Sequence, residues 1–218
     1  MLFDLDGTLV DTAPDMVRAL QEMQLHHGVA PVGYDEGRAN VSNGAMGLLR
    51  VGFPDSNDVQ RQGLVCEFVE RYATRLADES RLFAGMATLL DKLDAGGLPW
   101  GIVTNKPSHL SEPLLELLDL AQRCVCIVSG DTLEQRKPHP APLLHACKLA
   151  GVVPTDAIYV GDASRDIEAG RAAGMATIGA GYGYITFDDD PGAWGADLIV
   201  ADTQELAHTV LKAVNLGL

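Results

Sequence analysis

The first residues of the chain carry two aspartates separated by one residue. Asp4 and Asp6 follow the short apolar run Leu2-Phe3, and Gly7 comes directly after them. In open α/β folds, ligands bind outside the carboxyl ends of the strands. A glycine allows the chain to leave a strand sharply, because it adopts backbone conformations that other residues avoid. We therefore expect both carboxylates to face a crevice at one edge of a sheet.

Further polar residues follow apolar runs later in the chain. Thr104 and Asn105 follow one such run, and Lys137 lies in a proline-rich loop. Asp162 and Asp166 follow another run. If these runs are parallel strands, their tips meet the first two aspartates at one edge, where the carboxylates would repel one another without a cation. Oxygen ligands of this kind suit Mg²⁺, so the pattern predicts a Mg²⁺ site beside a lysine and a hydroxyl.

Together these motifs resemble those of the haloacid dehalogenase superfamily of phosphohydrolases. The resemblance covers essentially the whole chain, through Asp4-Leu5-Asp6-Gly7-Thr8, Thr104-Asn105, Lys137, and Gly161-Asp162 with Asp166. It implies that Asp4 is the nucleophile and that Asp6 is the general acid and base. It also implies that Thr104 and Lys137 bind and orient the phosphoryl group.

The resemblance further implies how the cofactor is held. Asp162 and Asp166 would bind Mg²⁺. Asp4 and the backbone carbonyl of Asp6 would complete the set of protein ligands. Backbone N–H groups beyond the strand ends, including those near Asn105, would complete a cradle for the phosphate.

Elementary chemistry supports these roles. An anionic carboxylate attacks an anionic phosphoryl group only if charge is neutralised, which Mg²⁺ and Lys137 would supply. An aspartyl-phosphate on Asp4 would divide one hard displacement into two easier ones. Asp6 would protonate the leaving alcohol and then deprotonate the attacking water. Because release of a halide needs no proton, an acid at this position favours a phosphatase over a dehalogenase.

Short apolar runs that alternate with amphipathic segments must position these residues. The runs lack strict alternation of polar and apolar residues, which is typical of strands buried on both faces of a parallel sheet. They lie at 2–3, 99–104, 125–128, 157–161, 176–179 and 198–200. Helical patterns lie at 85–95, 110–118, 141–150, 164–173 and 204–214. The alternation predicts an α/β fold with an open, doubly wound, Rossmann-like parallel sheet.

One interval interrupts this alternation. From residue 13 to residue 82 there are helical patterns and turns but no convincing strand. We expect Thr12 to be the N-cap of a long helix with a proline in its first turn, and a second long helix over 59–76. We interpret residues 13–82 as an all-α cap domain inserted into a core made of residues 1–12 and 83–218.

We expect substrate selectivity to lie in this cap. A turn between helical segments carries Ser42, Asn43 and Gly44, whose polar groups could reach the crevice and bind the leaving group. An ordinary helix N-cap is an equally good interpretation of this turn. By overall pattern the chain resembles the phosphoglycolate phosphatase group of the family. Segments within 182–197 and 100–107 are more similar to the branch that acts on N-acetylmuramic acid 6-phosphate.

Two alternatives to a phosphatase stay open. A phosphomutase of the β-phosphoglucomutase type has the same fold and would return the phosphoryl group to a sugar. A non-catalytic phosphate-sensing or partner-binding protein is the other alternative, although the intact motif residues argue against it. Beside the threonine motif, Lys106 is interpreted as an exposed loop lysine at least as readily as a ligand.

Composition limits the partners. The chain has 218 residues and a formal net charge of −14, which leaves no basic footprint for nucleic acid or an anionic membrane surface. We expect a small phosphorylated metabolite as the partner, bound by a monomer or a homodimer. The four cysteines form no disulfide pattern and no run is long enough to span a bilayer, which favours the cytoplasm. Because few residues precede Asp4, we expect either a native start further upstream or an abbreviated first strand.

Overall fold

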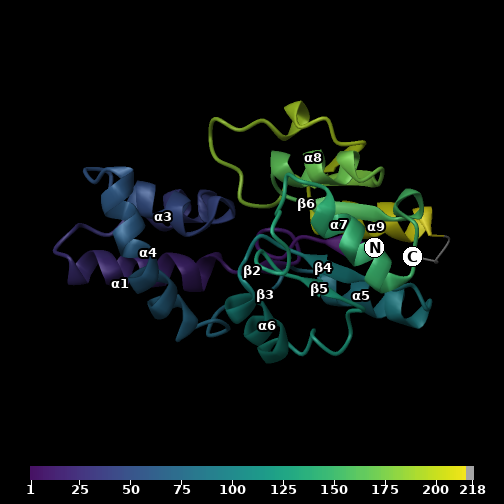
Figure 1. Cartoon of the computed structure of the whole chain (residues 1–218), viewed down its shortest axis with the longest axis horizontal. Helices are drawn as coiled ribbons and strands as arrows, with labels where there is room; N and C mark the ends of the chain where they lie inside the picture. Colours follow the sequence, from purple (N-terminus) through teal and green to yellow (C-terminus); the bar gives the residue numbers. More distant parts are fainter. Residues whose placement is uncertain (215–218) are drawn as a thin grey trace.

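A parallel sheet forms the centre of the larger part of the molecule in the computed structural model, which describes residues 1–214 (Figure 1). Within these residues the sheet has six strands in the order β5-β4-β1-β6-β7-β8, all parallel. The strands are β1 (Leu2–Phe3), β4 (Gly101–Val103), β5 (Ile127–Val128), β6 (Ile158–Gly161), β7 (Ala176–Ala180) and β8 (Leu198–Val200). Each expected strand region overlaps one of them, and the predicted fold class is confirmed.

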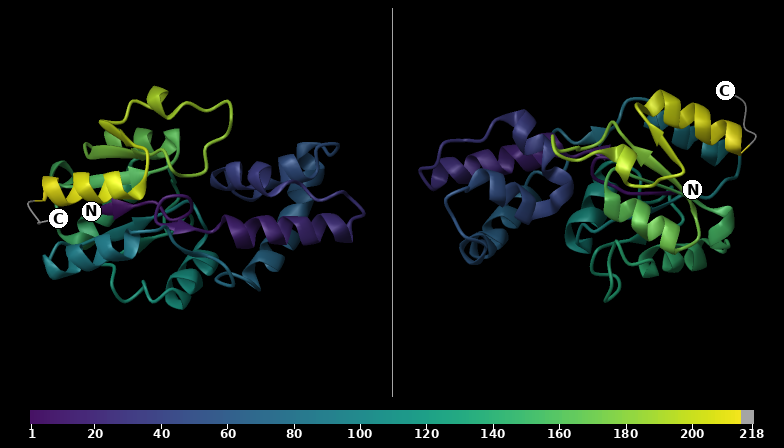
Figure 2. Two further views of the ribbon diagram at one scale, coloured as in Figure 1. Left: turned by 180° about the vertical axis from the view of Figure 1, so that it is seen from behind. Right: turned by 90° about the horizontal axis from the view of Figure 1, so that it is seen from above.

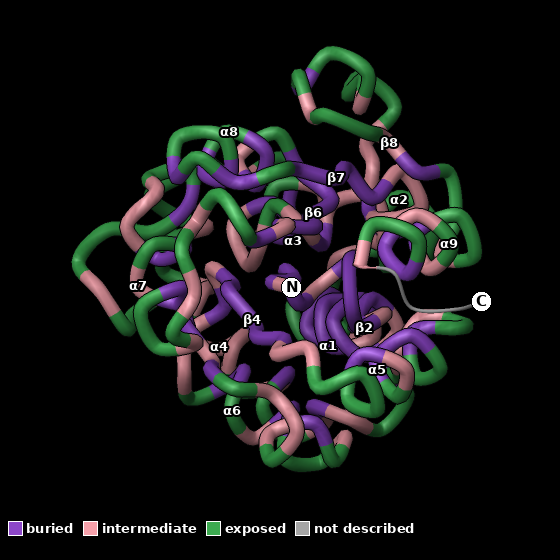
Figure 3. Tube along the Cα trace, turned by 90° about the vertical axis from the view of Figure 1, so that its right-hand side faces the viewer, coloured by how far each residue is buried: buried purple, intermediate pink, exposed green. Residues whose placement is uncertain are grey.

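Helices cover both faces of this sheet. Their bounds are α5 (Met86–Ala95), α6 (Ser108–Leu117), α7 (Ala141–Ala150), α8 (Ser164–Ala172) and α9 (Thr203–Ala213). Leu2 packs on the side of α7 and α8, whereas Phe3 packs on the side of α5, α6 and α9. Figure 3 shows the buried strands surrounded by helices whose outer surfaces are exposed. Burial on both faces explains why the strand runs show no polar alternation.

A group of helices lies beyond one end of the sheet (Figures 1 and 2). We call it the helical cap; it consists of α1 (Ala13–His26), α2 (Tyr34–Ala39), the 3₁₀ helix η1 (Val41–Asn43), α3 (Gly44–Gly52) and α4 (Asp58–Ala73). Its interior includes Leu20, Leu48 and Phe68, all buried. The assignment of residues 13–82 to a separate domain stays a prediction. No helix within residues 1–214 is both long and apolar enough to cross a membrane.

Two short strands join the cap to the core. β2 (Val10–Asp11) and β3 (Arg81–Leu82) pair antiparallel, so the chain enters and leaves the cap side by side. β3 lies inside the interval where we expected no strand, and that expectation is wrong at its last residues. A strand of two residues carries no readable periodicity, and its pairing with β2 is what defines it.

The start of α1 also differs from the expectation in one respect. Thr12 occupies the N-cap position and Pro14 lies in the first turn, but the Thr12 side chain makes no capping hydrogen bond. Its hydroxyl donates instead to Oδ1 of Asp6 at 2.5 Å. A carboxylate is a strong hydrogen-bond acceptor, so this hydroxyl binds Asp6 in the crevice and does not cap the helix.

Candidate active site

Asp4 lies at the end of β1, where the chain turns away from the sheet. Its side chain is buried, and its Oδ1 accepts a hydrogen bond from the N–H of Leu5 at 2.8 Å. Gly7 makes the turn with φ of 81°, and a Cβ at this position would lie 2.0 Å from Oδ2 of Asp162. Both the backbone conformation and the space therefore require the glycine that the sequence analysis singled out.

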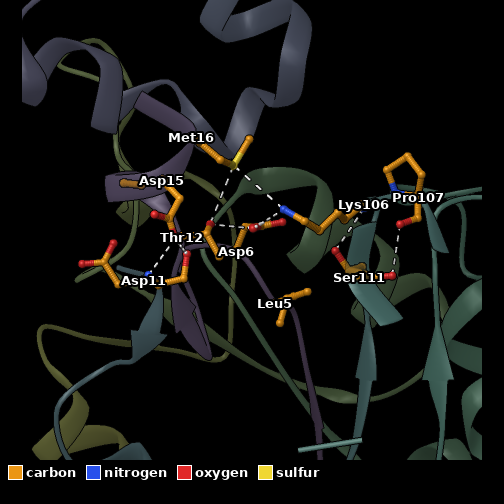
Figure 4. Close-up of polar contacts among 12 residues, drawn as sticks. Leu5, Asp6, Asp11, Thr12, Asp15, Met16, Lys106, Pro107 and Ser111 are labelled. Carbon is orange, nitrogen blue, oxygen red and sulfur yellow. Dashed lines mark hydrogen bonds and ion pairs between the residues drawn. The ribbon is translucent and has the colours of Figure 1, made fainter. Parts of the chain in front are cut away.

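Asp6 faces the cap side of the same turn. Figure 4 shows its carboxylate between the hydroxyl of Thr12 and the ammonium of Lys106, which lies 2.9 Å from Oδ1. Thr12 belongs to the entrance of the cap, and Lys106 follows β4. The proposed acid and base thus contacts both the cap connection and the core.

Lys137 is buried among oxygen atoms. Its Nζ lies 2.8 Å from Oδ1 of Asp4 and 2.7 Å from Oδ1 of Asp166. It also lies within hydrogen-bond distance of the Val103 carbonyl and the Tyr159 hydroxyl. Burial alone would lower the pKa of Lys137, but Asp166 and Asp4 raise it, so the ammonium stays charged at neutral pH.

Asp162 completes a cluster of buried carboxylates. Its Oδ2 accepts hydrogen bonds from the Ser42 hydroxyl at 2.6 Å and from the Tyr184 N–H at 2.9 Å. Its Oδ1 is buried and has no hydrogen-bond partner among the described residues. Burial raises the pKa of Asp162, and the charges of Asp4 and Asp166 raise it further.

These carboxylates fit a divalent cation. One oxygen from each of Asp4, Asp162 and Asp166 lies within 4.8 Å of the others. An unpartnered carboxylate oxygen in a buried site is costly unless a cation or a donor meets it. Oxygen donors of this kind suit Mg²⁺. Asp166 has a second task, because its Oδ2 accepts from the N–H of Ala163 at the start of α8.

Thr104 and Asn105 follow β4, beside this cluster. Thr104 is buried, and its hydroxyl oxygen accepts from the N–H of Lys106 at 3.1 Å. The Asn105 amide donates to the Lys137 carbonyl and accepts from the Lys137 N–H, at 2.9 and 3.1 Å. The Asn105 side chain therefore holds the lysine loop, a role that the sequence did not suggest for it.

The cap turn contributes to the site in two ways. The Ser42 hydroxyl donates to Asp162 of the carboxylate cluster, and Ser42 also lines the main cavity; its contact with the leaving group stays a prediction. The Ser42 carbonyl accepts a hydrogen bond from the guanidinium of Arg165. Asn43 and Gly44 line the main cavity of the site. The turn thus links the cap to the carboxylate cluster and borders the cavity.

Arg165 is a site residue that the sequence analysis did not name, and Lys106 is one whose role it left open. Lys106 is only 7% exposed, so its interpretation as an exposed loop lysine is wrong. It lies two residues beyond Thr104, and in an extended segment such residues point to the same side, which was the available signal. Arg165 lies between two proposed metal ligands along the chain; it interacts with the charges of Asp4, Asp162 and Asp166, and the cap adds the Ser42 carbonyl as an acceptor.

A cavity of about 590 Å³ lies between the cap and the edge of the sheet. Its floor includes Asp4, Thr104 and Lys137, and its cap wall includes Phe68 and Tyr72. The polar floor and the largely apolar wall suit a ligand with a charged end and a larger organic part.

The fold and the site together define an enzyme with a Rossmann-like parallel sheet, whose acidic crevice lies under a helical cap. The chain belongs to the haloacid dehalogenase-like hydrolase family, whose model matches residues 1–180. The resemblance seen in the motifs is therefore confirmed.

Named relatives cover nearly the whole chain. Over 208 residues it is 46% identical to a phosphoglycolate phosphatase of Xylella fastidiosa, covering 95% of this chain and 91% of the relative. Over 217 residues it is 41% identical to an N-acetylmuramic acid 6-phosphate phosphatase of Pseudomonas putida, covering 98% and 96%. A crystal structure of a predicted phosphoglycolate phosphatase from Haemophilus somnus matches with a TM-score of 0.84 and 27% identity, covering 98% and 96%. These relatives confirm the expected class of enzyme, a phosphatase.

Proposed function

We propose that this protein is a Mg²⁺-dependent phosphatase that hydrolyses a small phosphomonoester through an aspartyl-phosphate on Asp4. The observation that carries the proposal is the position of Asp4, whose carboxylate contacts the Lys137 ammonium and belongs to one cluster with the carboxylates of Asp162 and Asp166. This arrangement supports Asp4 as the nucleophile, because Lys137 and a cation bound by the cluster would place positive charge on both sides of the incoming phosphoryl group. Bound Mg²⁺, held by Asp4, Asp162, Asp166 and the backbone carbonyl of Asp6, would neutralise phosphoryl charge.

The roles of the other side chains follow from their positions. Lys137 neutralises the attacking and transferred oxygens, and Thr104 donates its hydroxyl to the phosphoryl group. Asp4 attacks phosphorus, and Asp6 gives its proton to the leaving alcohol. Asp6 then takes a proton from the water that hydrolyses the aspartyl-phosphate. Thr12 and Lys106 hold Asp6 on the cap side, where the leaving group would lie.

The cap completes the proposal. We assign residues 13–82 to a lid over a core of residues 1–12 and 83–218, and closure of this lid would exclude water from the crevice. The free state of the cysteines in the described part of the chain supports a reducing cytoplasm. We propose a monomer or a homodimer, with no nucleic acid or membrane partner.

The substrate is proposed to carry a carboxylate on its leaving group. Phosphoglycolate and N-acetylmuramic acid 6-phosphate, which two named relatives act on, share this group. The cavity of about 590 Å³ has room for either leaving group. Values of kcat/KM for both esters will decide between them.

Hydrolysis of p-nitrophenyl phosphate tests the proposed activity. We expect turnover with Mg²⁺, loss of turnover with a chelator, and a loss of at least about 10³-fold in Asp4→Asn, because a carboxamide is a poor nucleophile. Asp55→Asn, which changes an exposed aspartate away from the site, is the matched control. Activity of Asp4→Asn that equals that of the control would contradict the proposal. Release of one inorganic phosphate per ester consumed separates a phosphatase from a phosphomutase.

A further inference from the structure

Lys106 is a buried cation that the proposed chemistry does not fully use. Its side chain is 4% exposed, and its Nζ contacts Oδ1 of Asp6 at 2.9 Å and Sδ of Met16 at 3.9 Å (Figure 4). Its N–H donates to Thr104, and its carbonyl accepts from Gly130 at 2.8 Å. The backbone on both sides of this lysine is therefore fixed, and the ammonium is held at the cap side of the crevice.

Tyr72 brings a second polar group to the same place from the cap. Its ring centroid lies 4.5 Å from Nζ of Lys106, and the side chain is 1% exposed. Its hydroxyl oxygen is buried and close enough to Lys106 to accept from the ammonium, but the O–H has no acceptor among the described residues. Burial raises the pKa of Tyr72 to about 12, so the hydroxyl keeps its proton at neutral pH. A buried O–H without an acceptor is uncommon and points to a ligand atom that completes it.

The charge of the cavity points the same way. Its lining side chains include two carboxylates, Asp4 and Asp6, and a larger set of cations: Arg50, Lys106, Arg136, Lys137 and Arg165. Lys137 belongs to the phosphoryl end, whereas Lys106 lies beside Asp6, on the leaving-group side. In a chain with a net charge of −14, cations gathered in one cavity indicate a ligand with more negative charge than its phosphoryl group alone.

We propose that Lys106 and Tyr72 form a subsite for the carboxylate of the leaving group. The inference rests on the proposed phosphatase activity and names the residues that select its substrate. The ammonium has three N–H donors and Asp6 accepts one of them, so another can donate to a substrate carboxylate while Asp6 stays in place. The Tyr72 O–H then donates to the second oxygen. With a neutral leaving group, the Lys106 ammonium and the Tyr72 hydroxyl lack this acceptor, so the ester binds less well.

A matched pair of esters tests the subsite with the full-length, Mg²⁺-loaded protein. Phosphoglycolate and 2-hydroxyethyl phosphate differ only in a carboxylate against a hydroxymethyl group. N-acetylmuramic acid 6-phosphate and N-acetylglucosamine 6-phosphate differ in a carboxylate-bearing ether. The measured quantity is the ratio of kcat/KM for the acidic ester to kcat/KM for its neutral counterpart. A ratio is informative because any effect of a substitution on Asp6 is shared by both esters and cancels.

Two substitutions address the two donors separately. Tyr72→Phe removes only the hydroxyl, and we expect it to lower the ratio about tenfold; Lys106→Met removes the charge and should lower it about a hundredfold. Tyr34→Phe and Lys148→Met change a tyrosine and a lysine outside the cavity and should leave the ratio unchanged. Circular dichroism checks that each variant is folded, and Tyr72→Phe keeps the test decisive if Lys106→Met does not fold.

The outcomes separate the subsite from the activity itself. If the unchanged protein hydrolyses none of the four esters or p-nitrophenyl phosphate, the proposed function fails. If it hydrolyses them but shows no preference for the acidic esters, or keeps its preference in both variants, the carboxylate subsite is wrong. Preference for a bisphosphate over every carboxylate ester would also overturn it. An equal loss for both members of a pair would reduce Lys106 to a positioning residue for Asp6.

Discussion

Two buried lysines contact different carboxylates of the crevice. Lys137 contacts Asp4 and Asp166 at the phosphoryl end, and Lys106 contacts Asp6 on the cap side. Removal of one partner from a buried ion pair leaves a charge without compensation, which costs more than the pair contributes. The separation allows the nucleophile and the acid to stand on one short turn with different electrostatic partners, as their different tasks require.

Thr12 should matter for proton transfer through its contact with Asp6. Thr12→Val removes the hydroxyl that donates to Oδ1, whereas Thr12→Ser keeps it. We expect the valine variant to lower kcat about tenfold for an alkyl phosphate, whose leaving group needs a proton, and less for p-nitrophenyl phosphate. The serine variant should stay close to the unchanged protein. Equal losses for both esters would mean that the hydroxyl serves only the structure.

Gly7 allows a quantitative test of the turn that presents the two aspartates. Gly7→Ala carries the cost of a left-handed backbone, about 1–2 kcal/mol, and adds a contact at 2.0 Å with Asp162. Gly97→Ala is the matched control, because Gly97 has φ of 65° with nothing within 4 Å of a Cβ. Urea unfolding should show Gly7→Ala less stable than the control by about 2 kcal/mol. Similar stabilities of the two variants would show that the turn relaxes away from Asp162.

At the scale of elements, the sequence predicts what periodicity and strand burial encode. The six strands of the sheet and the helix α7 (Ala141–Ala150) lie where apolar runs and amphipathic spacing indicate them. The strand β3 (Arg81–Leu82) was missed because two residues cannot show a period, and only a partner distant in sequence defines them. Thr12 was placed correctly at the N-cap of α1, but the acceptor of its hydroxyl, Asp6, could not be read from the helix pattern because another element contributes it.

The candidate site likewise has some features that follow from local sequence pattern and others that depend on tertiary packing. Asp4, Asp162 and Lys137 could be placed together from sequence, because each follows a strand or a loop at one edge of the sheet. The contact of Lys106 with Tyr72 and that of Ser42 with Asp162 could not, because they depend on how the cap approaches the core. Local pattern fixes elements and strand ends, whereas contacts between the cap and the core need the packed tertiary structure.

The end of the cap depends on one buried carboxylate in α1. Asp15 accepts hydrogen bonds from the N–H groups of Glu79 and Ser80 and from the Ser80 hydroxyl, the last at 2.6 Å. Asp15→Ala leaves these donors without an acceptor, so we expect a loss of about 3 kcal/mol in the free energy of unfolding. Asp35→Ala, in the exposed first turn of α2 (Tyr34–Ala39), should change it by less than about 0.5 kcal/mol. Similar unfolding midpoints for the two variants would show that Asp15 does not hold the return of the chain.

For the whole molecule, the acidic charge poses the question of how an anionic ester is captured. The formal net charge is −14, and three carboxylates of the crevice are buried together. Mg²⁺ and the cations of the cavity would oppose this field at the one place where the ester binds. We therefore expect inorganic phosphate to bind at least about tenfold more weakly without Mg²⁺ than with it. Calorimetric titration in chelator and in Mg²⁺ measures the difference, and equal affinities would contradict it.

The same buried charge should make the stability of the metal-free protein depend on pH. Burial raises the pKa values of Asp4 and Asp162 in the folded protein above the usual carboxyl value of about 4 that they have in the unfolded chain. The folded state therefore holds more protons than the unfolded state, so stability is greatest below the unfolded pKa and is lost as the pH rises through the folded ones. Mg²⁺ binds the ionised carboxylates and should offset this loss. From about pH 5 to about pH 9, the melting temperature should fall in chelator and fall less in Mg²⁺. In Asp162→Asn, the melting temperature in chelator should depend less on pH, and Mg²⁺ should raise it less than in the unchanged protein. Parallel curves in chelator and in Mg²⁺ would show that the carboxylate cluster does not hold the cation.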